Sequence, residues 1–425
     1  MRVKALAISI ILLIGFAGVA SGQGPYSSYS QDKVNIYGLT KTKEGFLRRI
    51  MSEQALSLGY STLESDVQAL RNLPSVAEAK YTIDTLDQNP VYNILIVERT
   101  TALPIINFGG IRGNIWFQVG LTENNFRGVG ETLLGFYQNN NGRHAGQLYF
   151  QKPRILSSDW GYSLNLNSWS SQEPIFFDEG TEQYEYTNNA VGASILRNFG
   201  LFNRLELGGT YFVESYERSE GQGESPLGPS AFSLPKFLAK IEYKNVELDH
   251  QYFYLKGMEN IITYQNVITI DERSFFNSIQ YQGRLFLRPR PKLNLAFRVR
   301  MALSDNDNSP FAPFVADSHV NVRGIGNRID RGTAQLIINA EARYTIYHED
   351  FWASQLVIFS DSGTWRNPGG QLSQLFDPDQ FRQFVGVGVR INYQKVFGAT
   401  LRIDYGVDIY DLSQRGFVIG LGQYF

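Results

Sequence analysis

Cysteine is absent from the 425 residues, which excludes disulfide bonds and thiolate metal sites. The four histidines stand singly, at His144, His250, His319 and His348, and none shares a metal-ligand spacing with a carboxylate. We therefore expect no metal and no other cofactor. The formal net charge is only −2, and we expect no nucleic-acid partner.

Long apolar runs are missing everywhere except at the start of the chain. There, "MRVKALAISIILLIGFAGVASGQ" places Arg2 and Lys4 before an apolar run that ends in small residues. This order predicts a secretory signal peptide at residues 1–22, cleaved after Gly22, followed by a flexible lead at 23–32. The alternative is a membrane anchor, but the run is shorter than the roughly 20 residues that a spanning helix needs.

Catalytic motifs are absent as well. The chain has no Gly-x-Ser-x-Gly and no histidine that a motif places near a candidate serine. Its Gly-x-Gly pairs, which begin at Gly128, Gly324 and Gly420, lack the strand-to-helix setting of a nucleotide-binding loop. We expect that the protein is not an enzyme.

Residues 33–100 differ in pattern from everything that follows. "KVNIYG" predicts a short strand, and apolar residues recur at helical spacing in "KTKEGFLRRIMSEQ". Ser61 and Glu64 form a capping box that begins a second helix. "VAEAKYTIDTL" and "PVYNILIVE" then predict two strands around a turn. The order strand, helix, helix, strand, strand predicts one small α+β domain.

Beyond residue 100 the apolar residues recur with period two. In "ATLRIDYGVDIY", Leu401, Ile403 and Tyr405 share one face of a strand, whereas Arg402 and Asp404 share the other. Such runs reach about ten residues, the length that a tilted strand needs to cross a bilayer, whereas strands of soluble sandwiches are usually about 5 to 6 residues. The 24 tyrosines and 29 phenylalanines suit aromatic girdles at the two membrane interfaces.

These runs predict an all-β transmembrane barrel at residues 105–425, with about 16 antiparallel strands, in preference to a soluble sandwich. The expected strands begin near Ile111, Glu131, His144, Trp160, Tyr184, Arg204, Phe237, Val246, Ile261, Phe275, Leu293, Ala334, Trp352, Phe381, Ala399 and Phe417.

The two-part layout resembles the BamA-like outer-membrane protein assembly family, also called the bacterial surface antigen family. "LESDVQALRNLPSVAEAKYTID" is similar to a polypeptide-transport-associated (POTRA) domain, and the turn with Asn125, Gly128 and Gly130 is similar to the family's first barrel turn. The ending "GFVIGLGQYF", with Phe425, resembles the aromatic-ended signal of outer-membrane barrels. The family has several such N-terminal domains where this chain has one.

The most specific part of the resemblance is the segment "VNVRGIGNRIDRGTAQ", residues 320–335. It contains Val322, Arg323, Gly324 and Ile325, where the family has Val-Arg-Gly and an aromatic residue. Two strands later, "LVIFSDSGTW" matches a family strand motif ending in Asp-x-Gly, at positions 361 and 363. Five expected strands follow the loop, as in the family.

From these motifs we expect the loop to fold into the barrel, with Arg323 bound to Asp361 and Glu341 nearby, close to Gly363. The alternative is that these are ordinary lumenal or solvated charges, each worth at most about 1 kcal/mol. Arg328 and Arg331 receive no role.

The resemblance implies that the protein assists the insertion or translocation of unfolded β-rich client chains, by pairing strands with them. Two edges are expected to receive a client: the last strands of the small domain, and a seam between the first and last barrel strands. The seam residues are expected to be Ile111, Gly113, Val119, Phe417, Gly420, Gly422 and Phe425.

Other functions stay open at this point. A passive pore would need an empty lumen, and export of one dedicated secreted partner would use the same architecture. The outer membrane, with its lipids, is the expected location, with the small domain in the periplasm. Periplasmic or lipoprotein accessory factors are left open as partners.

Overall fold

The computed structural model describes residues 34–58, 63–86, 89–111, 114–155, 158–177, 180–219, 227–306, 313–316, 320–325, 330–377 and 380–425. The expected signal peptide and flexible lead lie outside these residues. Within the described part of the chain, no helix is both long enough and apolar enough to cross a membrane.

A small mixed domain comes first. It consists of β1 (Val34–Tyr37), α2 (Glu44–Leu58), α3 (Leu63–Arg71), β2 (Val76–Leu86) and β3 (Asn89–Glu98), in the order expected from the sequence. The sheet order is β1-β3-β2, with β1 parallel and β2 antiparallel to β3, so β2 is an edge strand. The helices bury Leu47, Val67 and Leu70 against Ile94 and Ile96 of β3.

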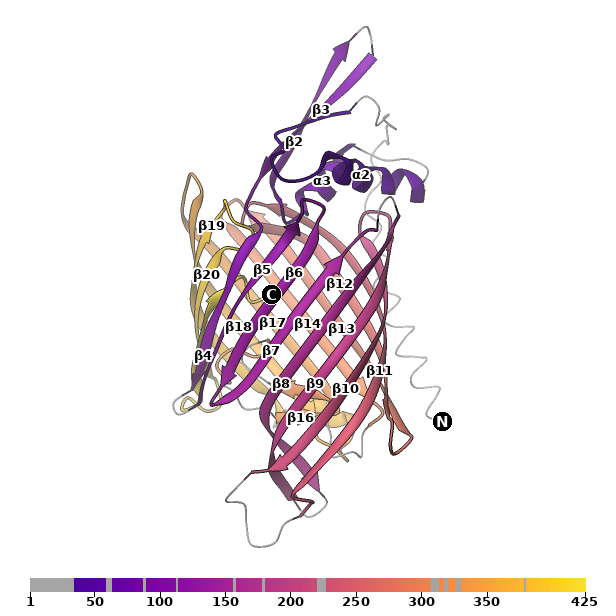
Figure 1. Cartoon of the computed structure of the whole chain (residues 1–425). Coiled ribbons are helices and arrows are strands. Elements are labelled where there is room, and N and C mark those ends of the chain that lie inside the picture. The colour runs from indigo at the N-terminus through magenta and orange to yellow at the C-terminus, as the bar shows by residue number, and fades with distance from the viewer. Residues whose placement is uncertain are drawn as a thin grey trace.

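A closed barrel of sixteen antiparallel strands follows, as the alternation predicted (Figure 1). Its strands are β4 (Ala102–Ile111), β5 (Asn114–Phe126), β6 (Glu131–Asn140), β7 (Arg143–Lys152), β8 (Trp160–Phe177), β9 (Gly180–Phe199), β10 (Asn203–Arg218), β11 (Ala231–Gln251), β12 (Tyr254–Thr269), β13 (Ser274–Arg290), β14 (Leu293–Ser304), β17 (Ala334–Glu349), β18 (Trp352–Arg366), β19 (Arg382–Tyr393), β20 (Thr400–Asp408) and β21 (Arg415–Leu421). Between β14 and β17, the short strands β15 (Phe314–Ala316) and β16 (Asp330–Gly332) pair with each other. A 3-10 turn, η2 (Leu372–Phe376), follows β18.

The predicted number of barrel strands was right, but the prediction missed one strand and divided another into two. The first barrel strand is β4, which contains Pro104 and the pair Gly109 and Gly110, whereas the first expected strand began near Ile111 and corresponds to β5. Proline is tolerated in an edge or seam strand, where a missing N–H breaks no ladder. Conversely, the segments expected at Phe237 and Val246 are one strand, β11, because this strand is about twice the expected length.

Outward-facing side chains form an apolar belt around the barrel. Leu148, Ile195, Ile358 and Val387 are each more than half exposed, which suits lipid rather than water. On β8 the exposed side chains change from leucine at 164 and 166 to serine at 168 and glutamine at 172. Strands β8 to β11 therefore continue beyond the belt, and Figure 1 shows them projecting at the end opposite the small domain.

The small domain rests on the barrel end nearest to it. The amide of Lys43 donates to the carbonyl oxygen of Gly128 at 2.8 Å, and Asn125 Nδ2 donates to Thr42 Oγ1 at 3.0 Å. On the other side, Arg71 Nε of α3 donates to Asp249 Oδ1 at 2.9 Å. Arg49 Nη2 of α2 also donates to Asp159 Oδ1, just before β8, at 3.1 Å. The domain is thus held at separated points, which include the turn between β5 and β6, the segment before β8 and the end of β11.

Glu98, the last residue of β3, organises the loop that makes the first of these contacts. Its carboxylate accepts from the amides of Thr40, Lys41 and Thr42 at 3.1, 2.8 and 2.9 Å. Burial alone would raise the pKa of Glu98, but hydrogen bonds from Thr40, Thr42 and the Lys41 amide outweigh it and lower the pKa to about 2. The loop therefore favours the ionised carboxylate.

We expect Gly128→Ala to weaken docking of the small domain. Gly128 has φ +78°, and a Cβ there would lie 2.1 Å from the Lys41 carbonyl oxygen. The matched control is Gly142→Ala, since Gly142 has φ +87° but open space around it, so it carries the backbone strain without the clash. Hydrogen exchange at the Lys43 amide should accelerate in Gly128→Ala only. Equal exchange in the two variants would contradict this contact.

The Glu98 contacts should also depend on pH. Because the folded pKa is depressed, their stabilisation is present above the usual glutamate pKa of 4.5 and is lost as pH falls toward about 2. At pH 6 the Lys41 and Thr42 amides should exchange more slowly in the wild type than in Glu98→Gln, and the difference should vanish near pH 2. Asp84→Asn, in the exposed part of β2, serves as the control. A difference that is independent of pH would be inconsistent with an ionised Glu98.

Candidate functional site

The loop motif, residues 322–325, lies in the barrel lumen against strands β17 to β20. Val322 and Arg323 are fully buried, and Ile325 is nearly so. Gly324 has φ +98°, which turns the backbone at the point of closest approach to the wall. The loop therefore occupies the lumen, where it meets inward-facing residues of β17 and β18.

Arg323 is the centre of this arrangement. Its Nε and Nη2 donate to the two carboxylate oxygens of Asp361 at 2.8 and 2.9 Å, and its backbone amide adds a bond at 3.0 Å. Nη1 donates to Glu341 Oε2 at 3.1 Å. The guanidinium also lies close to two rings, with centroids 3.6 Å away at Phe359 and 4.4 Å away at Tyr424. This is a bidentate, charge-assisted pair with added cation–π contacts.

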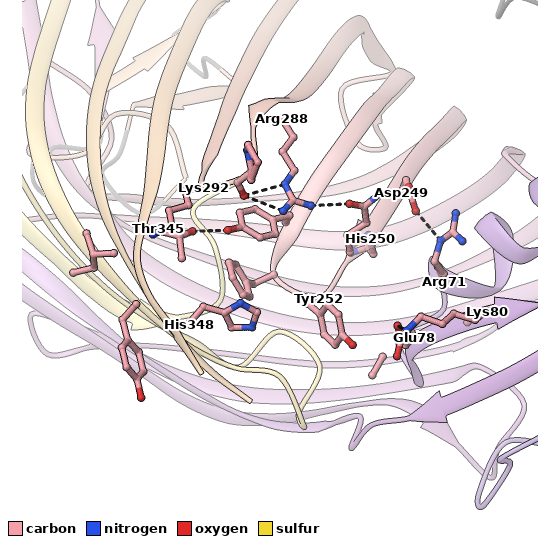
Figure 2. A pocket seen from close by; sticks show the side chains of 18 of the residues that line it. Arg71, Glu78, Lys80, Asp249, His250, Tyr252, Arg288, Lys292, Thr345 and His348 are labelled. Carbon is pink, nitrogen blue, oxygen red and sulfur yellow. Dashed lines mark hydrogen bonds and ion pairs between the residues drawn. The ribbon is translucent and has the colours of Figure 1, made fainter. Parts of the chain in front are cut away.

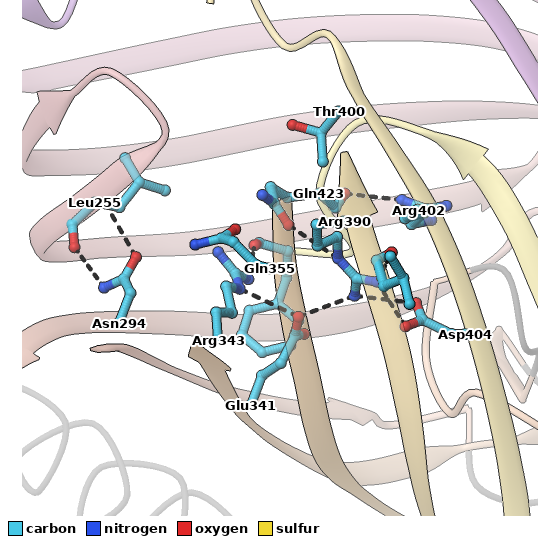
Figure 3. A network of polar contacts seen from close by, with 12 residues as sticks. Leu255, Asn294, Glu341, Arg343, Gln355, Arg390, Thr400, Arg402, Asp404 and Gln423 are labelled. Carbon is cyan, nitrogen blue, oxygen red and sulfur yellow. Dashed lines mark hydrogen bonds and ion pairs between the residues drawn. The ribbon is translucent and has the colours of Figure 1, made fainter. Parts of the chain in front are cut away.

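Two further arginines extend the pair into a network that crosses four strands. Arg390 on β19 donates to Asp404 Oδ1 at 2.7 Å and to Glu341 Oε1 at 2.9 Å (Figure 3). Arg343 on β17 donates to the same Glu341 oxygen at 3.1 Å. We call Arg323, Arg343, Arg390, Glu341, Asp361 and Asp404 the lumenal network. All six side chains are fully buried, and their three positive and three negative charges balance.

Glycines let the loop approach the wall closely. A Cβ on Gly324 would lie 2.7 Å from Phe384 and 2.9 Å from the Gly406 carbonyl oxygen. Reciprocally, a Cβ on Gly406 would lie 2.6 Å from the Arg323 carbonyl oxygen, and one on Gly416 would lie 2.9 Å from that of Gly324. The loop motif thus touches β20 and the last strand, β21, through backbone alone.

Ile325 stands where the resembled family has an aromatic residue. It packs in a buried cluster with Val322, Ile337, Trp365 and Phe384. Gly363 adjoins the same cluster, because a Cβ there would lie 2.5 Å from the Trp365 ring and 3.0 Å from Val322. The ring that the loop lacks at position 325 is supplied by the wall, at Trp365 and Phe384.

The seam, the contact between β4 and β21, is short. Among the described residues the ladder joins residues 417–420 to residues 107–110, whereas β4 pairs with β5 along its whole length. Phe417 contacts Phe108 edge to face, with centroids 6.1 Å apart. Residues 102–106 of β4, which include Pro104, have no ladder partner on the seam side among the described residues.

Only some of the predicted seam residues lie in the seam. Phe417 and Gly420 lie in the seam ladder, and Gly420 leaves room for Asn107, whose Oδ1 would be 2.1 Å from an added Cβ. The first-strand half of the prediction was wrong, because β4 had been missed. Ile111 ends β4, Gly113 lies outside the described residues, and Val119 belongs to β5.

Gly422 marks the point where the chain leaves the wall. It has φ +94°, and after it the segment 422–425 turns into the lumen, burying Tyr424 and Phe425. These rings pack against Leu248, Phe286 and Ala296 of β11, β13 and β14, on a part of the wall that is not adjacent to β21. Phe425 therefore belongs to the lumen and not to the seam ladder.

A backbone bridge spans the seam at the domain-side end. The amide of Thr100, just before β4, donates to the Lys395 carbonyl oxygen at 2.8 Å, and the Phe397 amide donates to the Thr100 carbonyl oxygen at 2.7 Å. The Arg99 guanidinium lies 4.8 Å from the Phe397 ring centroid. The turn between β19 and β20 thus holds the start of β4 directly, bypassing β21.

A cavity of about 830 Å³ lies between the small domain and the barrel (Figure 2). One side is the edge strand β2, at Glu78 and Lys80, and the other is formed by the ends of β11, β13 and β17. Arg71 and Arg288 line it, each held by a hydrogen-bonded neighbour, whereas Lys292 is exposed. The cavity brings an unpaired strand edge next to the entrance of the lumen.

Arg343, Arg390 and Asp404 were not singled out from the sequence, although Glu341 was. The signal was present, since period-two alternation places all of them on inward faces. The sequence did not show which inward-facing residues of different strands come into contact. Of the two arginines without a role, Arg328 lies outside the described residues, and Arg331 lies in β16.

Reversing the charge at Arg323 should destabilise the folded barrel. Arg323→Glu leaves the three buried carboxylates that Arg323 meets facing a fourth, and losing one member of a buried pair costs about 3–5 kcal/mol. The control is Lys240→Glu, which reverses a less buried lumenal pair and should cost on the order of 1 kcal/mol. The folded fraction is measured by heat-modifiable electrophoretic mobility and by denaturant unfolding. Partial rescue by Asp361→Arg in the same chain would identify the direct pair, whereas wild-type folding of Arg323→Glu would contradict it.

Comparison with known proteins shows which solved structures have a similar fold. The chain matches no protein-family model and no curated protein sequence. It is similar to the structure of BamA from Haemophilus ducreyi lacking POTRA domains 1–3, with a TM-score of 0.54 and 16% identity over 91% of this chain and 83% of that one.

Two structures of another protein are equally similar. CdiB from Acinetobacter baumannii has a TM-score of 0.55 and 12% identity, covering 92% of this chain and 73% of that one. CdiB from Escherichia coli has a TM-score of 0.55 and 9% identity, covering 88% and 74%. At these identities the similarity establishes the fold: a sixteen-stranded barrel of the kind found in BamA and CdiB, preceded by a small mixed domain.

Proposed function

We propose that this chain is an outer-membrane protein that assists the insertion or translocation of β-rich client chains by strand pairing. In this proposal the small domain is POTRA-like and lies in the periplasm, and the apolar belt contacts lipid. The observation that carries the proposal is the short seam between β4 and β21.

A short ladder matters because lipid offers no hydrogen-bond partners. Every other ladder of the barrel is longer among the described residues, so opening the barrel elsewhere would expose more backbone groups, at several kcal/mol each. Among the described residues β21 pairs with β4 only at residues 417–420, the bridge at Thr100 holds the start of β4, and residues 102–106 between them present an edge. An incoming strand would add hydrogen bonds to this edge and would satisfy it as β21 leaves. Pro104 weakens the edge as a template for unwanted pairing, as prolines do on edge strands.

The loop motif is suited to support such a seam from inside. Gly324 lies against Gly416 of β21 and Gly406 of β20, and the lumenal network fixes Arg323 beside them. The loop therefore holds the last strands in position without adding to the seam ladder. The small domain supplies a first contact, because the free edge of β2 faces the cavity at the barrel entrance.

A passive pore fits the lumen less well. The loop motif and the segment 422–425 both lie inside the barrel, and their aromatic and charged side chains join opposite parts of the wall. Export of a single secreted partner would use the same seam and lumen. Depletion followed by proteomics distinguishes the two, since an insertion factor should cause loss of many barrels and a dedicated exporter the loss of one secreted protein.

Locking the seam should abolish activity. Phe108 and Ile419 are register partners across it, and the chain has no native cysteine to interfere, so Phe108→Cys with Ile419→Cys gives a single disulfide. After oxidation in liposomes, insertion of a β-barrel client should fall to the level of protein-free liposomes, and reductant should restore it.

The matched control locks a contact that the proposal leaves closed. Val387 and Tyr405 are outward-facing register partners between β19 and β20, so Val387→Cys with Tyr405→Cys should retain full activity when oxidised. Client insertion at the wild-type rate by the locked seam variant would sink the proposal.

A further inference from the structure

A series of polar contacts follows the domain-side rim of the barrel from the small domain toward the seam. It begins at α3, where Arg71 Nε donates to Asp249 Oδ1 at 2.9 Å. Gln251 Nε2 donates to the other carboxylate oxygen of Asp249 at 2.8 Å, and Arg288 Nη1 donates to Gln251 Oε1 at 2.9 Å. The Arg288 guanidinium in turn lies 3.7 Å from the centroid of the Tyr254 ring. Figure 2 shows Arg71, Asp249 and Arg288 beside the cavity.

From Tyr254 the series continues through buried residues. The Tyr254 hydroxyl donates to Thr345 Oγ1 at 2.9 Å, and Gln355 Nε2 donates to the same oxygen at 3.3 Å. Asn392 Nδ2 donates to Gln355 Oε1 at 3.3 Å, and Thr400 Oγ1 donates to Asn392 Oδ1 at 2.7 Å. All five of these residues are less than one-tenth exposed. We call the whole series, from Arg71 through Tyr254 to Thr400, the rim chain.

The rim chain ends beside the bridge at Thr100. Thr400 is the first residue of β20, and it directly follows the turn of residues 394–399, whose Lys395 and Phe397 bond to Thr100. Within this turn the Tyr393 amide donates to the carbonyl oxygen of residue 399 at 2.8 Å. One turn therefore carries the last link of the rim chain on one side and the bonds that hold the start of β4 on the other.

The buried links of the rim chain depend on one another. A buried donor or acceptor that loses its partner keeps the full cost of its desolvation, and hydrogen bonds in series strengthen one another. If Thr345 or Gln355 moves, the neighbour on each side loses a bond, so the series is most stable when all its links are made together. The link from Tyr254 on β12 to Thr345 on β17 also passes over β13 and β14, whereas the backbone ladders join only adjacent strands.

We propose that the rim chain couples the docking of the small domain to the bridge at Thr100. When α3 moves away from Asp249, the links are lost in series, the turn of residues 394–399 loosens, and β4 loses the bonds at its start. This coupling rests on the proposed function, for which it names a regulation of the seam. The position of the small domain sets how firmly β4 is held next to the edge at residues 102–106.

The first half of the rim chain is accessible to a ligand in the cavity between the small domain and the barrel. Arg71, Asp249, Gln251, Arg288, Tyr254 and Thr345 all line this cavity, and the edge strand β2 forms its opposite side. A client segment that pairs with β2 would lie against these side chains, and its peptide groups would compete for their hydrogen bonds. Entry of a client at one end of the rim chain thus loosens the seam at the other end.

Hydrogen exchange in the purified full chain tests the coupling without any client. Arg71→Glu places a carboxylate against Asp249 and breaks the first link. Exchange at the amides of Thr100 and Phe397, which form the bridge, should then rise roughly fivefold, the lower end of typical coupling between distant sites. The Asp408 amide, at the opposite end of β20, should not change. An equal rise at Asp408 would indicate general loosening of the barrel and would overturn the proposal.

Removal of one hydroxyl from the middle of the rim chain distinguishes it from other routes. Tyr254→Phe keeps the aromatic ring but loses the bond to Thr345, so bridge exchange should already be raised and Arg71→Glu should raise it no further. Tyr281→Phe is the matched control, because it removes a tyrosine hydroxyl that donates to Asn260 Oδ1 at 2.9 Å. There Arg71→Glu should keep its full effect. If Arg71→Glu also keeps its full effect in the Tyr254→Phe protein, the rim chain does not carry the coupling.

The coupling must also act in reverse, because a coupling free energy between two sites is reciprocal. Thr400→Val removes the hydroxyl of the last link. It should accelerate exchange at the Asn72 amide at the end of α3, whose side chain donates to the Leu248 carbonyl oxygen of β11 at 2.6 Å, by a similar factor. An unchanged Asn72 amide would contradict the proposal even if Arg71→Glu left α3 in place.

Heat-modifiable mobility establishes that each variant is a folded barrel. The exchange measurements and client insertion fail independently of each other. Coupling in a barrel that inserts no client would remove the proposed function alone, and client insertion without coupling would remove this inference alone.

Discussion

The buried pair of Arg323 and Asp361 is the interaction on which the lumen depends. Two charges taken out of water cost several kcal/mol each, and this cost is offset only when geometry is good and every remaining donor is used. Here both carboxylate oxygens of Asp361, Glu341 and two rings contact one guanidinium, and the Arg323 backbone amide also donates to Asp361. The loop is therefore stable inside the barrel only as a complete set, which makes its position well defined. A loop held by scattered apolar contacts would have many alternatives of similar energy.

The network also divides the barrel into unlike halves. Strands β17 to β20 are joined across the lumen by ion pairs, whereas on β5 to β8 the inward groups include uncharged amides such as Gln118, Gln138 and Gln147. The seam lies at the boundary between these halves. One side of the seam is thus attached to strands joined by buried ion pairs, and the other to strands whose ladders are supplemented mainly by hydrogen bonds between uncharged side chains. If the barrel opens, β4 and its neighbours are the part free to move.

Alternation alone was enough to predict much of this architecture. Period-two patterns identified which side chains face inward on β17 and β20, so Glu341 was placed in the lumen correctly. The sequence pattern did not show how the strands pair with one another, and this limited the prediction. Pro104 and a glycine pair concealed β4, and the length of β11 made it look like two strands, since nothing local reports where the lipid belt ends. Arg298 and Arg402 were visible as inward residues, but their meeting at Tyr424 depends on a segment that crosses the lumen. Such contacts are set by closure of the whole sheet and leave no local signal.

Contacts outside the ladder between β4 and β21 help to keep the seam closed. Its own ladder is four residues long, yet the loop touches β21 at Gly416, the segment after β21 is buried among lumenal arginines, and Thr100 is bonded to the turn after β19. Each of these contacts lies inside the barrel or at its domain-side end, where a polypeptide entering past the small domain would arrive. A ligand in the lumen can therefore change the stability of the seam without touching its hydrogen bonds. In the proposed function, closure against lipid and opening toward a client are then set by different groups, so one barrel wall can be both tightly closed and able to open.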